Sequence, residues 1–120
     1  MYEESKAFVV RRPRHEVKPS VPCRVWLERV SREPVVSCDA ELVDLSRNGL
    51  QIHAADRFDN DEPVVIHIQQ DSTGIDLALS SRVRWQRSGE ISAVAVGCVF
   101  DQPLGYEEMG ELFLSGILSS

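Results

Sequence analysis

The stretch that decides the fold is residues 43–54, "VDLSRNGLQIHA". Apolar residues lead into "SRNG", and a regular alternation of apolar and polar residues leaves it. Alternation with a period of two is typical of a half-buried β-strand. Asn48-Gly49 is a strong hairpin signal, because both residues tolerate the positive φ angles that tight turns require. The stretch therefore predicts two strands joined by a hairpin.

Two polar residues before the turn, Asp44 and Ser46, need a separate explanation. The inward set of the incoming strand includes Leu42, whereas Val43 and Leu45 form the apolar set nearer the turn. A phase slip of this kind predicts a β-bulge or a bend, which re-aims side chains. We expect Asp44 and Ser46 to face outward from the strand. Taken alone, both residues would simply form side-chain turns that stabilise the hairpin.

The period of two continues over most of the chain from about Val21. It predicts further strands in "VPCRVWLERV", "PVVSCDAEL", "VVIHIQ", "IDLALSSRVRWQR" and "ISAVAVGCVF". The fourth of these is long for a strand, so we expect a bend or bulge within it. Trp85 shares the parity of its apolar residues and is predicted to lie in the core. Helical spacing occurs only in the tail, about residues 105–118. About six short strands and one helix predict a mainly β fold, a small antiparallel barrel.

Composition places the chain among ordinary globular proteins. Its 120 residues suit one domain, and 42% are hydrophobic while 27% are charged. No apolar run reaches the roughly 18 residues of a membrane span, and the N-terminus does not resemble a signal peptide, so we expect a cytoplasmic location. Cys23, Cys38 and Cys98 form no CxxC pair, which argues against disulfides and zinc. We expect buried structural thiols.

Charge is unevenly distributed along the sequence. The net charge of -6 disfavours broad binding to nucleic acid, yet residues 6–18 hold five basic residues and one acidic residue. We therefore divide the chain into a flexible basic N-terminal arm, residues 1–18, and a barrel with its helix, residues 19–120. A basic arm on an acidic protein favours a small anionic ligand.

Signatures of catalysis are missing from the sequence. It contains no GxGxxG, P-loop, HExxH or EF-hand motif. Ser46 lacks the flanking glycines of a nucleophile elbow. Asp39 and Glu41 form a carboxylate pair on one strand face, which a solvated surface explains more simply, and His53 and His67 have the outward parity of surface residues. We predict that the chain is not an enzyme and holds neither a metal nor a cofactor.

Two segments, "RRPRHEV" from Arg11 and "DLSRNG" from Asp44, together resemble the PilZ domain, the bacterial receptor module for cyclic di-GMP. The signature of that family is R-x-x-x-R followed by (D/N)-x-S-x-x-G. The second half matches fully here. The first half departs, because His15 and Glu16 stand where the second arginine is expected. "SRVRWQR" and "VGCVFDQP" also resemble later strands of the family, so the resemblance covers roughly residues 10–118.

This resemblance implies a six-stranded antiparallel PilZ-type β-barrel with a C-terminal α-helix, and a non-catalytic receptor that signals to a downstream protein partner. Arginine can pair with phosphate oxygens or the guanine O6/N7 edge and can stack on a base. A carboxylate can accept hydrogen bonds from guanine, a serine can donate one, and a glycine allows close approach. The residues that the resemblance implies for binding cyclic di-GMP are Arg11, Arg12, Arg14, Asp44, Ser46 and Gly49.

Two other functions remain open at this point. The PilZ family includes members without a working arginine motif, which act as adaptors in pilus, motility or secretion machinery. The irregular arginine spacing favours such a degenerate adaptor, which would act through protein–protein interaction and would not bind cyclic di-GMP. A small barrel enzyme acting on a nucleotide is a third possibility, but the sequence offers no acid/base or metal constellation for it.

Overall fold

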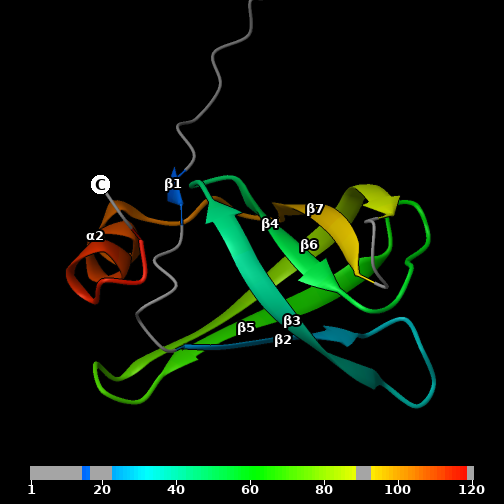
Figure 1. Cartoon of the computed structure of the whole chain (residues 1–120), viewed down its shortest axis with the longest axis horizontal. Helices are drawn as coiled ribbons and strands as arrows, with labels where there is room; N and C mark the ends of the chain where they lie inside the picture. Colours follow the sequence, from blue (N-terminus) through cyan, green and yellow to red (C-terminus); the bar gives the residue numbers. More distant parts are fainter. Residues whose placement is uncertain (1–14, 17–22, 89–92, 119–120) are drawn as a thin grey trace, which may run out of the picture.

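The computed structural model describes residues 15–16, 23–88 and 93–118 (Figure 1). The described residues form seven strands and one helix. In chain order these are β1 (His15–Glu16), β2 (Arg24–Arg29), β3 (Val36–Leu45), β4 (Gly49–Ala54), β5 (Pro63–Gln70), β6 (Ile75–Ser88), β7 (Val94–Phe100) and α2 (Tyr106–Leu114).

Six of the strands close into an antiparallel barrel. Neighbouring strands follow the order β3-β2-β5-β6-β7-β4, and β4 pairs in turn with β3. Closure leaves few strand edges unpaired, which is how small β proteins avoid exposing a sheet edge. The two-residue β1 adds to β3 beside the barrel. The predicted six-stranded antiparallel barrel with a C-terminal helix is confirmed.

The core lies inside the barrel and beneath α2. Alternate residues of the six barrel strands point inward, and Leu27, Ile52 and Ile66 are completely buried. Met109 and Leu112 of α2 are buried in the same cluster, so the helix covers one end of the barrel (Figure 1). The helix is shorter than predicted: it ends at Leu114 and not near residue 118. Gly116, just beyond it, adopts a φ of 83°, which is outside the helical region.

The hairpin between β3 and β4 forms as predicted, but for a different reason. The backbone N–H of Ser46 donates to the carbonyl of Gly49 at 2.8 Å. Neither Asn48 nor Gly49 has a positive φ, so that part of the prediction is wrong. A Cβ at position 49 would instead collide with the backbone carbonyl of Cys98 in β7. Glycine is required here because two strands approach each other closely.

Two β-bulges re-aim side chains on the barrel. The register of β3 against β4 shifts between Leu42 and Asp44, which confirms the phase slip predicted from the sequence. The register of β6 against β7 shifts between Val83 and Trp85. The second bulge turns Trp85 to the outside, where it is 38% exposed. The predicted core position of Trp85 is therefore wrong.

The loop before β5 has a polar composition, but it contributes a buried ion pair and a buried aromatic ring to the structure. The side chains of Arg29 and Glu62 are both buried and form two contacts of 2.7 Å, Nε to Oε2 and Nη2 to Oε1. The Glu62 carboxylate also accepts the N–H of Asp59 at 2.9 Å. The Arg29 guanidinium lies 4.5 Å from the centre of the Phe58 ring, which is buried as well. These contacts anchor the loop to β2.

The three cysteines are free, and only Cys98 is fully buried. Burial raises the pKa of the Cys98 thiol to about 12. Partial burial, together with a 3.0 Å hydrogen bond from Sγ to Asp56 Oδ2, raises the pKa of Cys38 to about 11. Burial also raises the pKa of Cys23. The predicted buried thiol is confirmed for Cys98, whereas Cys23 and Cys38 are only partly buried.

These raised pKa values predict a loss of stability in alkali. Above about pH 9 the thiols of the unfolded chain ionise while the folded thiols stay protonated, so the unfolded state binds fewer protons and is favoured. For Cys98 we expect the free energy of unfolding to fall by about 1 kcal/mol between roughly pH 8 and pH 10. Urea denaturation at both pH values measures this fall. In the Cys98→Ala variant, the free energy of unfolding should fall less between these pH values, because the contribution of Cys98 is absent. An equal fall in both proteins would contradict the prediction.

Candidate functional site

The hairpin that joins β3 to β4 carries three of the predicted site residues. Ser46 is 4% exposed, and its hydroxyl accepts the N–H of Asn48 at 3.3 Å and donates to the carbonyl of Gly49 at 3.4 Å. This is the serine turn that the residues taken alone predict. The expectation that the Ser46 side chain faces outward is wrong, because its hydroxyl is used within the turn. Asp44 is half-buried at the end of β3.

The start of the described chain lies beside this hairpin. His15 pairs with Leu45 and Glu16 pairs with Asp44, so β1 occupies the edge of β3 next to the predicted ligand residues. The predicted arginines, Arg11, Arg12 and Arg14, lie outside the described residues. Arg14 directly precedes His15 in sequence. The two described residues that follow the arginines in sequence therefore lie beside Leu45 and Asp44.

Strand pairing aligns Asp44 with three other positions on the outer face. Asp44 of β3 is opposite Gln51 of β4, Gln51 is opposite Gly97 of β7, and Gly97 is opposite Trp85 of β6. With neighbouring strands about 4.8 Å apart, this row spans roughly 14 Å. The indole of Trp85 lies directly over Gly97, where a Cβ would collide with the ring. We call these four residues the outer row.

A further residue of the hairpin, Arg47, ties it to the helix. Its Nε donates to the carbonyl of Leu104 at 2.8 Å, and its Nη1 lies 3.2 Å from the hydroxyl of Tyr106. The guanidinium also lies 4.2 Å from the centre of the Tyr106 ring. The backbone N–H of Leu104 in turn donates to the Arg47 carbonyl at 2.8 Å. The hairpin and the first turn of α2 are thus fastened to each other.

The arrangement of these elements agrees with the comparison to known families. The sequence profile of the PilZ domain matches residues 10–113. The chain belongs to the PilZ domain family. None of the curated proteins compared with it is a match. The PilZ domain is a non-catalytic receptor or adaptor domain, and the chain is accordingly not an enzyme.

Residues of the types that enzymes use for catalysis have surface or packing roles in this PilZ domain. Asp39 and Glu41 are exposed on β3. The ring of His67 stacks on Trp26 at a centroid distance of 4.7 Å, and its Nε2 lies 2.7 Å from Oε1 of Glu28. His67 is therefore only partly exposed. Across the described ranges, no group of three His, Cys, Asp or Glu side chains is placed to hold a metal ion.

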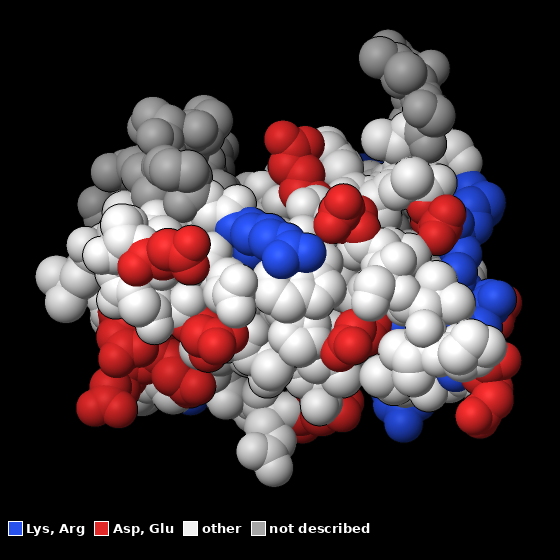
Figure 2. Space-filling model, turned by 90° about the horizontal axis from the view of Figure 1, so that it is seen from below, with Lys and Arg blue, Asp and Glu red and all other residues white. Residues whose placement is uncertain are grey.

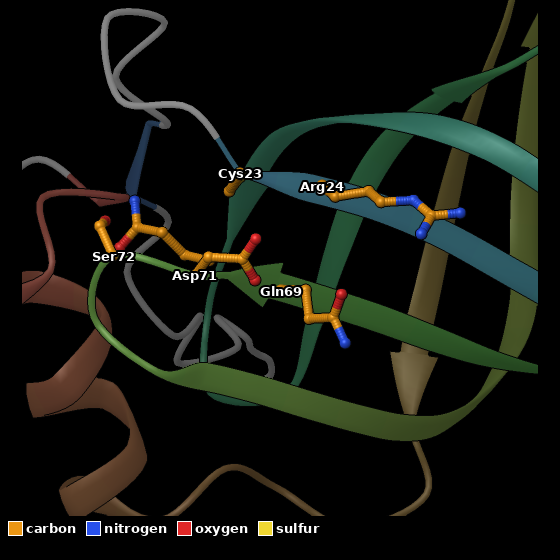
Figure 3. A pocket seen from close by; sticks show the side chains of 6 residues that line it. Cys23, Arg24, Gln69, Asp71 and Ser72 are labelled. Carbon is orange, nitrogen blue, oxygen red and sulfur yellow. The ribbon is translucent and has the colours of Figure 1, made fainter.

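A cavity of about 510 Å³ lies where β2 begins and β5 ends (Figure 3). Cys23, Arg24, Gln69 and Asp71 are among the residues that line it. The Arg24 guanidinium extends along β2, away from the Cys23 end of the cavity, and lies 4.3 Å from the centre of the Trp26 ring. The cavity therefore presents a carboxylate and amides where a phosphate would need cations. We assign no anionic ligand to it.

Sequence reasoning missed two residues of the candidate site, Trp85 at the far end of the outer row and Arg47 in the hairpin. The bulge in β6 could not be located from its pattern, so Trp85 was assigned to the core. A signal for its position existed in Gly97, because a glycine inside an apolar strand often marks the close approach of another group. Arg47 occupies a variable position of the D-x-S-x-x-G pattern, which assigns it no role.

No helix in the described parts of the chain is long and apolar enough to cross a membrane.

Proposed function

We propose that this PilZ domain is a receptor for cyclic di-GMP. The observation that supports the proposal is the register of β1, in which His15 and Glu16, the two residues directly after Arg14 in sequence, pair with Leu45 and Asp44 at the hairpin. The hairpin carries the complete D-x-S-x-x-G pattern. Cyclic di-GMP has two phosphates and two guanines, and the arm and the barrel wall supply partners for both.

Each group of residues has a distinct task in this proposal. Arg11, Arg12 and Arg14 bind phosphate oxygens or guanine edges. The Asp44 carboxylate accepts hydrogen bonds from N1–H and N2–H₂ of one guanine. Trp85, exposed at the other end of the outer row, offers a stacking surface to a second base.

The two remaining motif residues support the binding surface. Ser46 fixes the shape of the turn through its two hydrogen bonds. Gly49 allows the hairpin to lie against β7. We assign the arm to residues 1–18 and the barrel with its helix to residues 19–120. On binding, the arm closes over the outer row, and a downstream protein recognises the new surface in the cytoplasm.

Removing Asp44 tests the proposal. We expect Asp44→Ala to weaken cyclic di-GMP binding by about 10- to 100-fold, because hydrogen bonds to a charged group contribute roughly 1.5–3 kcal/mol. Arg12→Ala should cause a similar loss through the arm. Isothermal titration calorimetry measures both, with cyclic di-AMP as the ligand control. The matched control is Asp39→Ala, a carboxylate of the same strand outside the outer row. Native affinity in both Asp44→Ala and Arg12→Ala would contradict the proposal.

One observation favours the adaptor function instead. His15 and Glu16 occupy the positions at which a second arginine would complete R-x-x-x-R. An adaptor would release no heat with cyclic di-GMP and would show no thermal shift at concentrations that saturate PilZ receptors. With that result the hairpin would serve protein recognition alone, and the receptor proposal would be withdrawn.

A further inference from the structure

One strand of the barrel extends beyond its neighbour. β6 pairs with β5 from Ile75 to Arg82, whereas its pairing with β7 begins only at Ser81. Residues 75–80 of β6 therefore have a partner strand on one edge only, within the described part of the chain. The other edge is open, and an open edge is a template for pairing with another chain.

The direction of the backbone groups along this edge follows from one hydrogen bond. The N–H of Asp101 donates to the carbonyl of Ser80 at 2.8 Å, so the backbone groups of Ser80 face the side on which β7 would lie. Because these groups alternate between the two edges of a strand, those of Asp76 and Ala78 face the same open side. The described residues supply no other backbone partner to Asp76 or Ala78.

The helix α2 runs beside the open edge and leaves a groove. One cavity of about 340 Å³ lies between Leu77 and Leu114, and a second of about 500 Å³ lies between Leu79 and Glu108. The two cavities follow each other along β6 and share the same side of α2. We call them together the β6–α2 groove. Leu114 is 90% exposed at its margin, and Leu77 and Leu79 are only partly buried in it.

The charges around this groove have one sign. Its lining includes no Lys or Arg among the described residues, and its acidic members are Asp76, Asp101, Glu108 and Glu111. Figure 2 shows acidic side chains gathered at the end of the molecule where Figure 1 places α2. Such a surface attracts a basic partner and repels an acidic one, including a second copy of the same groove.

We propose that the β6–α2 groove binds an extended basic segment of a partner protein as an added β-strand. The backbone of this segment pairs with Asp76 and Ala78, which provides affinity without sequence preference. Side chains of the segment alternate between two faces. Apolar ones contact Leu77 and Leu114, while Lys or Arg meet the carboxylates. This site is separate from the cyclic di-GMP site.

A short peptide tests the proposal directly. The probe is acetyl-Arg-Val-Lys-Val-Arg-Val-amide, titrated into the ¹⁵N-labelled full chain. We expect amide shifts confined to residues 75–80 of β6 and to α2. Two further peptides carry N-methyl groups on the three valines or on the three basic residues. In an added strand, the N–H groups of only one set, the valines or the basic residues, face the β6 edge. The peptide methylated on that set loses several hydrogen bonds and should bind at least about tenfold more weakly than the unmethylated peptide. Equal binding of all three peptides, or no binding of the first, overturns the proposal.

Two variants separate backbone pairing from charge. Ala78→Pro removes an N–H from the open edge and leaves the pairing with β5 intact, while Ala78→Val keeps that N–H as the matched control. Glu111→Lys changes the charge of the groove on an exposed helix position. Ala78→Pro and Glu111→Lys should each weaken peptide binding by about tenfold or more and leave cyclic di-GMP binding unchanged. The proposal is overturned if Ala78→Pro and Glu111→Lys both bind the peptide with native affinity. It is also overturned if the native chain forms a dimer that Glu111→Lys dissociates, because the groove would then bind a second copy.

Discussion

Replacing Arg29 with methionine is expected to lower the free energy of unfolding by about 3–5 kcal/mol. The Arg29 and Glu62 side chains are 7% and 1% exposed and meet at 2.7 Å. Without the guanidinium, the Glu62 carboxylate stays buried and loses the contacting opposite charge that compensates for its lost hydration. Urea denaturation near neutral pH measures the loss.

The double variant Arg29→Met with Glu62→Gln is the control for this prediction. Removing both charges avoids the buried unpaired carboxylate, so much of the lost stability should return. Acid provides a second check. Hydrogen bonds from Arg29 lower the pKa of Glu62 below its ordinary 4.5. The pair therefore stabilises the fold above that pH, and this stability is lost as the pH falls through the lowered pKa. A cost below about 1 kcal/mol for Arg29→Met would show that the pair is not effectively buried.

Gly49→Ala is expected to cost about 4 kcal/mol or more, which is enough to prevent folding of a marginally stable domain. The added methyl group would collide with the backbone carbonyl of Cys98. The Cys98 carbonyl belongs to the backbone and not to a flexible side chain, so β4 and β7 would have to move apart at the end where their pairing begins. Thermal and urea denaturation measure this effect.

A second glycine provides the matched control. Gly110 lies within α2, and a Cβ there would meet nothing within 4 Å. Gly110→Ala should stabilise the protein by about 0.5–1 kcal/mol, because alanine favours helix and restricts the unfolded chain. Equal effects of the two substitutions would contradict the close contact at Gly49. If the prediction holds, lost ligand binding in Gly49→Ala reports lost structure and not a lost ligand contact.

The strands, the hairpin and the phase slip at Asp44 could be predicted because each depends on local alternation or turn chemistry. Trp85 could not be placed, because its parity was counted through a bulge whose position only the pairing with β7 fixes. The Arg29–Glu62 pair joins residues 33 apart in sequence, and no local pattern connects them. The side-chain turn of Ser46 was visible in the sequence. The roles of Arg11, Arg12 and Arg14 stay a prediction, since they lie outside the described residues.

The contacts of Arg47 have a consequence for how this protein can diverge in evolution. A lysine at this position could not reproduce both the hydrogen bond to Leu104 and the stacking on Tyr106. Loss of the aromatic ring at position 106 would likewise remove the stacking contact of the guanidinium and weaken selection for arginine at position 47. Among relatives that keep this geometry, positions 47 and 106 should therefore change together. For the same reason, exchanging either the hairpin or the helix alone between relatives is expected to separate the guanidinium from the ring that it contacts.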